Sequence, residues 1–199
     1  MKAAHATLAR FALAMLAAGA ASTFAMPAEA SVQARAGLDQ GLNLGLGMTG
    51  ASLNLTAGPI TVGGAVTSAS VYYGSVGTSL TPAAHLVYTV RDTGTIAFGL
   101  LGAYTGVQTY ASTPVGVAPE PVVIPVGEAG LALSYRYDFP NFFGRSLPIT
   151  FSPTVTFMTD DKGMVKFGPH TSLEVAARFT PEAELTVGGG TIVGVRFRL

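Results

Sequence analysis

Cysteine is absent from this chain and charged residues are scarce. Among 199 residues there is no cysteine, and only 11% are charged, compared with about 25% in typical soluble domains. The lack of cysteine excludes disulfide bridges, thiolate metal ligands, a cysteine nucleophile and a cysteine-linked lipid anchor. Eleven basic residues balance eleven acidic ones, so the composition gives no indication of a basic surface for nucleic acid.

The first thirty residues have the features of a secretory signal. Lys2 and Arg10 precede an apolar, alanine-rich run over residues 11–21, and the small-residue site Ala28-Glu29-Ala30 follows it. A basic region, a short apolar region and a cleavage site in this order predict Sec-type export. We therefore expect a signal peptide at residues 1–30.

Cleavage after Ala30 leaves residues 31–199, which is a length typical of one domain. Cleavage within Ala20-Ala21-Ser22 is a second possibility. An uncleaved membrane helix over residues 11–28 is the alternative to both.

The mature chain has no sustained helical stripe of apolar residues, whereas alternation with a period of two recurs along it. In residues 149–157 the apolar side chains fall on one face of the expected strand, and serine and threonine fall on the other. Residues 164–179 repeat this pattern, and residues 184–199 repeat it as the expected last strand. Within that strand, Gly188-Gly189-Gly190 is interpreted as a place where another backbone approaches closely. The mature chain is therefore predicted to be all-β.

The turn at residues 160–163 predicts a hairpin with a defined register. Residues paired across a hairpin point to the same face of the sheet. A register that places Phe157 opposite Phe167 also places Thr154 opposite His170, so that apolar residues meet apolar ones and polar residues meet polar ones.

The polar face of the expected strands consists mainly of glycine, alanine, serine and threonine. A soluble sheet would expose lysine, glutamate and arginine to water instead. Small polar side chains suit the interior of a narrow barrel whose apolar face contacts lipid. Because hydrocarbon cannot pair with backbone groups, such a sheet must close on itself. We therefore predict a closed, antiparallel, up-and-down transmembrane β-barrel.

Eight strands are the simplest count, and ten follow if residues 31–56 hold an additional hairpin. The eight-strand arrangement places the C-terminus and the proline-rich segment of residues 112–125 at the same end of the barrel. Turns at the periplasmic end of such barrels are normally short. A long connection there is the main inconsistency of the eight-strand prediction.

In this pattern the mature chain resembles the small outer-membrane β-barrel families of the OmpA and OmpX kind. The most specific element is the alternating C-terminal segment of residues 191–199, which resembles the terminal strand that barrel-assembly machinery recognises. That signal usually ends in an aromatic residue, whereas this chain ends in Leu199. The resemblance implies a monomer surrounded by outer-membrane lipid in a two-membrane bacterium. It also implies a non-enzymatic structural, adhesion or narrow-transport role without a cofactor.

Charged side chains concentrate on the expected inward face of the last two strands. Because an unpaired charge in a desolvated lumen is costly, these groups are expected to pair. We predict that Arg178 lies opposite Glu184 and that Asp39 pairs with Arg196. The network is interpreted as a salt-bridged plug that fixes the register, with an ion path or gate as the alternative. Its predicted members are Asp39, Lys166, His170, Glu174, Arg178, Glu184, Arg196 and Arg198.

A hydrolytic site is a second hypothesis. His170 and Ser172 on the penultimate expected strand, followed by Glu184, resemble the triad of the outer-membrane lipid A 3-O-deacylase family. That resemblance implies that Ser172 is the nucleophile, His170 its general base and Glu184 the group that orients the base. The triad of that family faces lipid, whereas alternation turns His170 and Ser172 toward the lumen of this barrel.

A soluble, exported β-barrel that binds a small apolar ligand is the third hypothesis, and it places Phe151, Phe157 and Phe167 inside. His85 has no second histidine or carboxylate near it in the sequence, so it is interpreted as a polar residue at the rim rather than as a metal ligand. No metal site is predicted.

Overall fold

The computed structural model describes residues 34–47, 50–68, 80–110, 121–142, 144–159, 170–188 and 193–199. Within these ranges no helix has the length and hydropathy needed to cross a membrane. The described residues form ten strands: β1 (Gly41–Gly47), β2 (Gly50–Ala57), β3 (Ile60–Ser68), β4 (Leu80–Asp92), β5 (Ile96–Tyr110), β6 (Pro121–Phe142), β7 (Arg145–Thr159), β8 (His170–Thr180), β9 (Ala183–Gly188) and β10 (Val193–Arg198).

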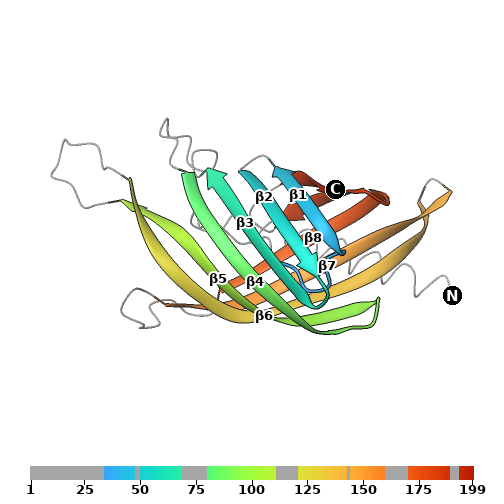
Figure 1. Ribbon diagram of the computed structural model, residues 1–199. Coiled ribbons are helices and arrows are strands. Elements are labelled where there is room, and N and C mark those ends of the chain that lie inside the picture. The colour runs from blue at the N-terminus through green and yellow to red at the C-terminus, as the bar shows by residue number, and fades with distance from the viewer. Residues whose placement is uncertain are drawn as a thin grey trace.

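The ten strands form one closed, antiparallel barrel in which each strand pairs with its neighbours in sequence (Figure 1). Pairing of β1 with β10 closes the sheet, with Leu44 opposite Phe197 and Leu46 opposite Val195. Closure leaves no sheet edge with unpaired backbone groups. The predicted closed barrel is confirmed, with the alternative count of ten strands rather than eight.

The two strands that the simplest prediction lacked come from opposite ends of the chain. At the C-terminal end, residues 184–199 form two strands rather than one, and Val187 of β9 lies opposite Val193 of β10. At the N-terminal end, β2 pairs with β1 and adds one strand, whereas the ten-strand alternative placed a whole additional hairpin in residues 31–56. Residues 184–199 were interpreted as one strand because Val187 and Val193 share a face and are six positions apart, so that alternation continues through the turn. Across the β1–β2 turn the alternation changes phase, since Leu42 lies opposite Leu55.

Gly188 marks the end of β9. Its φ of +85° lies in the left-handed region, and a Cβ on it would lie 2.2 Å from the backbone oxygen of Leu173. The predicted close approach of another backbone is therefore confirmed at Gly188. The positive φ, which glycine adopts without steric cost, also lets the strand end there.

Short turns and the C-terminus share one end of the barrel. The β2–β3, β4–β5, β6–β7 and β8–β9 turns lie there, together with the start of β1 and the end of β10. The remaining connections join strand ends at the opposite side. Tyr110 at the end of β5 and Pro121 at the start of β6 therefore lie away from the C-terminus, contrary to the eight-strand prediction, and residues 121–125 of the predicted long connection belong to β6. The last predicted strand is in fact two strands, β9 and β10. Each of the strands β3 to β8 therefore runs in the direction opposite to the one that the eight-strand prediction assigned to it.

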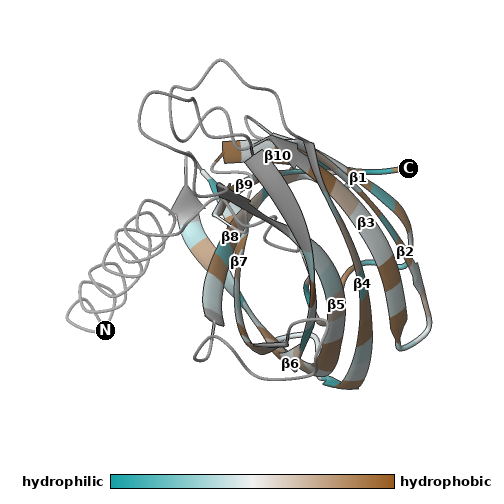
Figure 2. Cartoon of the chain, turned by 90° about the vertical axis from the view of Figure 1, so that its left-hand side faces the viewer, coloured by the Kyte–Doolittle hydropathy of each residue, from teal (hydrophilic) through white to brown (hydrophobic). Residues whose placement is uncertain are grey.

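Apolar side chains point outward and small polar ones point inward. On β2, Leu53 and Leu55 are 47% and 55% exposed, whereas Ser52 and Asn54 are 3% and 0% exposed. Figure 2 shows the resulting alternation of apolar and polar bands along β4 and β5. The predicted orientation of the two faces is confirmed. Phe157, which the soluble-barrel hypothesis placed inside, is 52% exposed.

The β7–β8 hairpin has a register two residues away from the predicted one. Thr154 lies opposite Ser172, and Thr156 lies opposite His170. Because the shift is even, every side chain keeps its predicted face, which explains why the face pattern alone could not distinguish the two registers. Phe167 lies outside the described residues.

The barrel is taller on one side than on the other. Strands β4 to β8 contain between 11 and 22 residues, whereas β1, β2, β9 and β10 contain between 6 and 8. Figure 1 shows β5, β6 and β7 extending beyond the short strands.

Candidate functional site

Residues 34–40, here called the interior segment, precede β1, and residues 34–38 lie buried within the barrel. Ala34, Arg35, Ala36 and Leu38 are between 0% and 5% exposed. Ala34 and Ala36 pack on one side of the interior, while Arg35 between them forms ion pairs on the other. The segment therefore contacts two walls of different chemistry.

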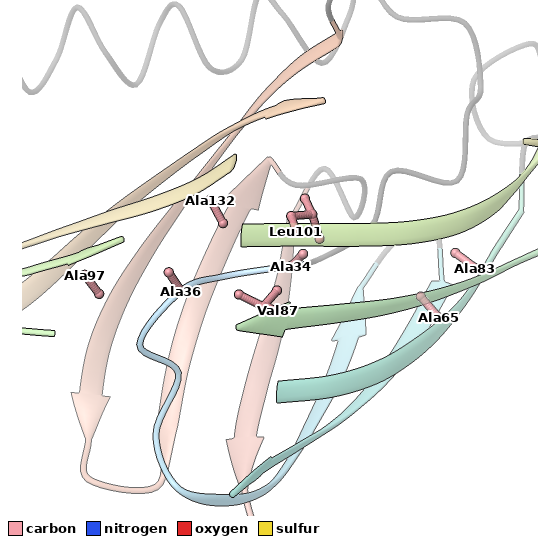
Figure 3. Close-up of a cluster of buried hydrophobic side chains, with 8 residues drawn as sticks. All are labelled: Ala34, Ala36, Ala65, Ala83, Val87, Ala97, Leu101 and Ala132. Atoms are coloured by element: carbon pink, nitrogen blue, oxygen red, sulfur yellow. The ribbon is translucent and has the colours of Figure 1, made fainter. Parts of the chain in front are cut away.

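The wall that Ala34 and Ala36 contact, called the apolar wall below, is formed by apolar side chains of β3 to β6, four of them alanines. Figure 3 shows these side chains together with those of the segment. Small residues on this wall leave the space that a further backbone needs. The members of the wall are Ala65, Ala83, Val87, Ala97, Leu101 and Ala132.

Gly37 shows how closely the segment approaches the apolar wall. Its φ is +65°, and a Cβ on it would lie 2.6 Å from the Cβ of Ala97. Any other residue would suffer both the strain of a positive φ and a steric clash. The backbone nitrogen of Gly37 donates a hydrogen bond to Oγ1 of Thr89 at 3.2 Å, and Oγ of Ser134 donates to the carbonyl oxygen of Ala36 at 2.8 Å.

The opposite wall, formed by β8 to β10, carries a buried cluster of ion pairs and is called the charged wall. Nη1 of Arg35 lies 2.9 Å from Oε1 of Glu184 and 3.9 Å from Oε1 of Glu174. Arg196 bridges the same two carboxylates, with 2.6 Å from Nη1 to Glu184 and 2.6 Å from Nη2 to Glu174. All four side chains are at most 7% exposed. Two guanidinium groups thus neutralise two carboxylates away from water.

A second set of contacts holds the segment at the end of the barrel where the short turns lie. Asp39 forms an ion pair with Arg178, which also lies 3.5 Å from Oε2 of Glu184. Arg136 of β6 donates to the carbonyl oxygen of Gly37. Gln40 exchanges two hydrogen bonds with the backbone of Gly58 in the β2–β3 turn, at 2.9 and 2.8 Å.

The predicted charge network is confirmed in part. Arg178 lies opposite Glu184 in the sheet, as predicted. The predicted pair of Asp39 with Arg196 is wrong, because Asp39 lies near the barrel end and pairs with Arg178, whereas Arg196 is bound by Glu174 and Glu184.

Three other predicted members of the network are not placed in it. Arg198 is exposed at the end of β10, opposite Asn43, and no ion pair of it is seen within the described part of the chain. Lys166 lies outside the described residues, and so does the side chain of His170.

Arg35 is the member of the network that sequence reasoning missed. The sequence held one signal, because Arg35 is the only lysine or arginine between Arg10 and Arg91. An isolated cation beside two alanines does not reveal its partners by itself. Glu184 is 149 positions away, and only barrel closure brings the two residues together.

The described interior contains further polar residues that do not contact the interior segment through ion pairs. Glu128 accepts hydrogen bonds from Thr105 and Thr156, each at 2.8 Å.

His85, predicted at the rim, is 4% exposed in the middle of β4. That prediction was wrong because β4 begins at Leu80, five residues before the histidine.

The predicted hydrolytic residues are not assembled into a triad. Oγ of Ser172 shares a hydrogen bond of 2.6 Å with Oγ1 of Thr154. Glu184 lies opposite Arg178, six positions along β8 from Ser172, which corresponds to about 20 Å in an extended strand. The carboxylate of Glu184 is bound by arginines and does not reach Ser172.

Comparisons with protein-family models, with curated proteins and with solved structures find no match to this chain. In the described ranges, no group of three or more histidine, aspartate or glutamate side chains is placed to hold a metal ion. The interior is therefore interpreted from its own chemistry. Its arrangement binds a segment that contains one buried arginine between a wall of apolar side chains and a pair of carboxylates.

Proposed function

We propose that this chain is an outer-membrane β-barrel protein of a two-membrane bacterium, exported by a Sec-type signal. We propose further that it has a non-enzymatic role in the envelope, as a structural, adhesion or narrow-transport protein of the OmpA and OmpX kind. The observation that carries the proposal is the orientation of the two faces around the closed sheet. Apolar side chains cover the outside, and threonine, serine and ionic groups fill the inside.

The exposed apolar surface is difficult to reconcile with water as the surrounding solvent. Leu86, Leu100, Leu131, Val155 and Phe179 come from five successive strands, and each is between 40% and 56% exposed. Soluble monomers rarely expose contiguous apolar patches of more than a few hundred Å². A band of this kind around a closed barrel is typical of a surface that contacts hydrocarbon.

Strand length and the distribution of turns support the same proposal. A membrane-crossing strand needs about 9 to 11 residues, and β4 to β8 contain between 11 and 22. Outer-membrane barrels have short turns on the periplasmic side, together with both ends of the barrel domain when the strand number is even. The proposal therefore places the short-turn end of this barrel in the periplasm.

The interior supports a non-enzymatic role. Glu174, Glu184 and Arg196 bind one another and Arg35, and the hydroxyl of Ser172 is bound to Thr154. These groups are thus engaged in contacts that hold the barrel and its interior segment. The proposed partners are outer-membrane lipid around the sheet and the barrel-assembly machinery acting on the C-terminal strand.

Cysteine labelling tests the proposal, because the chain has no cysteine of its own. Leu131→Cys and Glu182→Cys place a thiol at two positions that are both exposed in the structure, the first in the middle of β6 and the second in the β8–β9 turn. In vesicles, a water-soluble maleimide should label the turn variant quickly and the strand variant at least tenfold more slowly. Equal labelling of both variants in a folded protein would refute the membrane placement.

A further inference from the structure

We propose that one side of the barrel holds the membrane beside it thinner than the surrounding bilayer. That side, here called the short face, consists of β9, β10, β1 and β2, which are neighbours around the closed sheet. The inference rests on the proposed membrane placement and goes beyond it. It assigns a bilayer-deforming surface to one face and names the partner of that face as the acyl chains of bilayer lipid.

The first step concerns the height of the sheet. The strands of the short face contain between 6 and 8 residues, whereas β4 to β8 contain between 11 and 22. A strand tilted by about 40° rises about 2.5 Å per residue along the barrel axis. The short face is therefore about 15 to 20 Å high, whereas the apolar band of outer-membrane barrels is about 25 Å high.

The second step concerns where backbone pairing ends on the short face. The ladder between β1 and β2 ends at Gly47 opposite Gly50. Within the described residues, the ladder between β1 and β10 ends at the same residue, opposite Gly194. Because hydrocarbon cannot pair with backbone groups, it extends no higher on this side than the ladders do. A spanning surface that is shorter than the bilayer is accommodated by thinning of the bilayer or by oligomerisation.

The third step concerns what covers the short face. Leu55 of β2, Val62 of β3 and Leu86 of β4 are successive partners in the sheet, and each is between 50% and 55% exposed. The apolar surface of the short face thus continues without a break toward the taller strands, around which lipid is proposed. An open hollow of about 710 Å³ lies on β1 to β4, where Gly63 and Gly64 are surrounded by apolar side chains. A flexible acyl chain can fill this hollow without a matching side chain, so lipid rather than a second copy is the proposed partner.

Spin labels on single cysteines test the proposal. Leu46→Cys places a label next to the last residue of β1, and Leu131→Cys places the matched control in the middle of β6. The two leucines are 48% and 47% exposed. In a bilayer of undisturbed thickness, Leu46 would lie about 12 Å above the start of β1, near the middle of the hydrocarbon. Beside a thinned bilayer it lies at the water interface.

Power saturation measures how often each label collides with a water-soluble nickel complex. In dioleoyl phosphatidylcholine vesicles, these collisions should be at least fivefold more frequent for the label on β1 than for the label on β6. Dilauroyl lipid thins the whole bilayer, so it should raise the collisions of the β6 label severalfold and change those of the β1 label by less than twofold. Equal collision frequencies in the folded protein would overturn the proposal. Spin–spin broadening of the β1 label would also overturn it, because a second copy would then cover the short face.

Arginine variants provide a second measurement that needs no label. Arginine on the lipid-facing side is costly in the middle of a bilayer and nearly neutral at its interfaces. Leu131→Arg should therefore lower the urea concentration at the unfolding midpoint, whereas Leu46→Arg should leave it unchanged, and an equal decrease in both variants would contradict the thinning. Flotation with vesicles distinguishes the two proposals. A wild type that does not float refutes the membrane placement, whereas a floating protein with equally deep labels refutes only the thinning.

Discussion

The apolar wall and the charged wall hold the same seven residues in different ways. The apolar wall contributes apolar side chains, most of them alanines, and close backbone packing, so its fit depends on volume. The charged wall contributes buried carboxylates, so its fit depends on exact pairing of opposite charges. The comparison shows how a narrow barrel can admit a chain on one side and fix its position from the other.

The largest expected effect is on the charged wall. Glu184→Ala leaves the buried Arg35 with only the 3.9 Å contact to Glu174 and weakens the binding of Arg196. Breaking a buried ion pair typically costs about 3 to 5 kcal/mol. Urea unfolding of the reconstituted protein should show a loss in this range, whereas Glu182→Ala in the exposed turn should change the free energy of unfolding by about 0.5 kcal/mol or less. Equal losses in the two variants would show that the buried ion pairs of the charged wall contribute no more to stability than an exposed glutamate does.

A smaller effect is expected where the backbone approaches the apolar wall. Gly37→Ala introduces a Cβ at 2.6 Å from Ala97 and adopts a positive φ. Strain and overpacking together should cost about 2 to 4 kcal/mol. Gly94→Ala is the matched control, since its φ of +81° is similar and no atom lies within 4 Å of its added Cβ. The difference between the two variants in urea unfolding measures the clash alone, and a difference of zero would show that the segment does not press on the wall.

The volume of the apolar wall is tested on a single strand. Ala132 is 0% exposed and faces the interior segment, whereas Ala129 of the same strand faces outward. Ala132→Val should cost about 1 to 3 kcal/mol through overpacking, and Ala129→Val should have little effect on the free energy of unfolding. If both variants unfold like the wild type, the wall has spare room and the packing argument fails.

The smallest effect is expected for the ion pair at the barrel end. The side chains of Asp39 and Arg178 are 27% and 33% exposed, and partly exposed pairs contribute about 0 to 1 kcal/mol. The loss caused by Asp39→Asn should disappear in 1 M salt, where charges are screened within about 3 Å. The loss caused by Glu184→Ala should persist. Equal salt dependence in the two variants would contradict the difference in burial.

Much of the fold could be predicted from local patterns. Alternation along residues 149–157 assigned Thr156 to the interior and Phe157 to the exterior, and the structure agrees. The same period could not locate hairpin turns that preserve it, so residues 184–199 were interpreted as one strand. It also could not distinguish registers that differ by two residues, as the pairing of Thr154 with Ser172 shows.

The candidate site was predictable only where its members are neighbours in the sheet. Arg178 and Glu184 flank one turn, so their pairing followed from the sequence. His85 was misplaced because its strand begins five residues earlier than the pattern indicated. Asp39 was assigned the wrong arginine because its partner depends on how far along the barrel axis each side chain lies, which alternation does not specify.

The sequence by itself determined that this chain forms strands with an apolar outer face and an inner face of small, polar side chains, because side-chain direction in a strand repeats every two residues. The tertiary structure alone decided what fills the interior. Apart from the isolated Arg35, residues 34–40 carry no local signal of their destination, and the carboxylates that bind Arg35 come from strands at the other end of the chain. Closure of β1 on β10 brings those carboxylates to the arginine, and this long-range contact holds the segment inside the barrel.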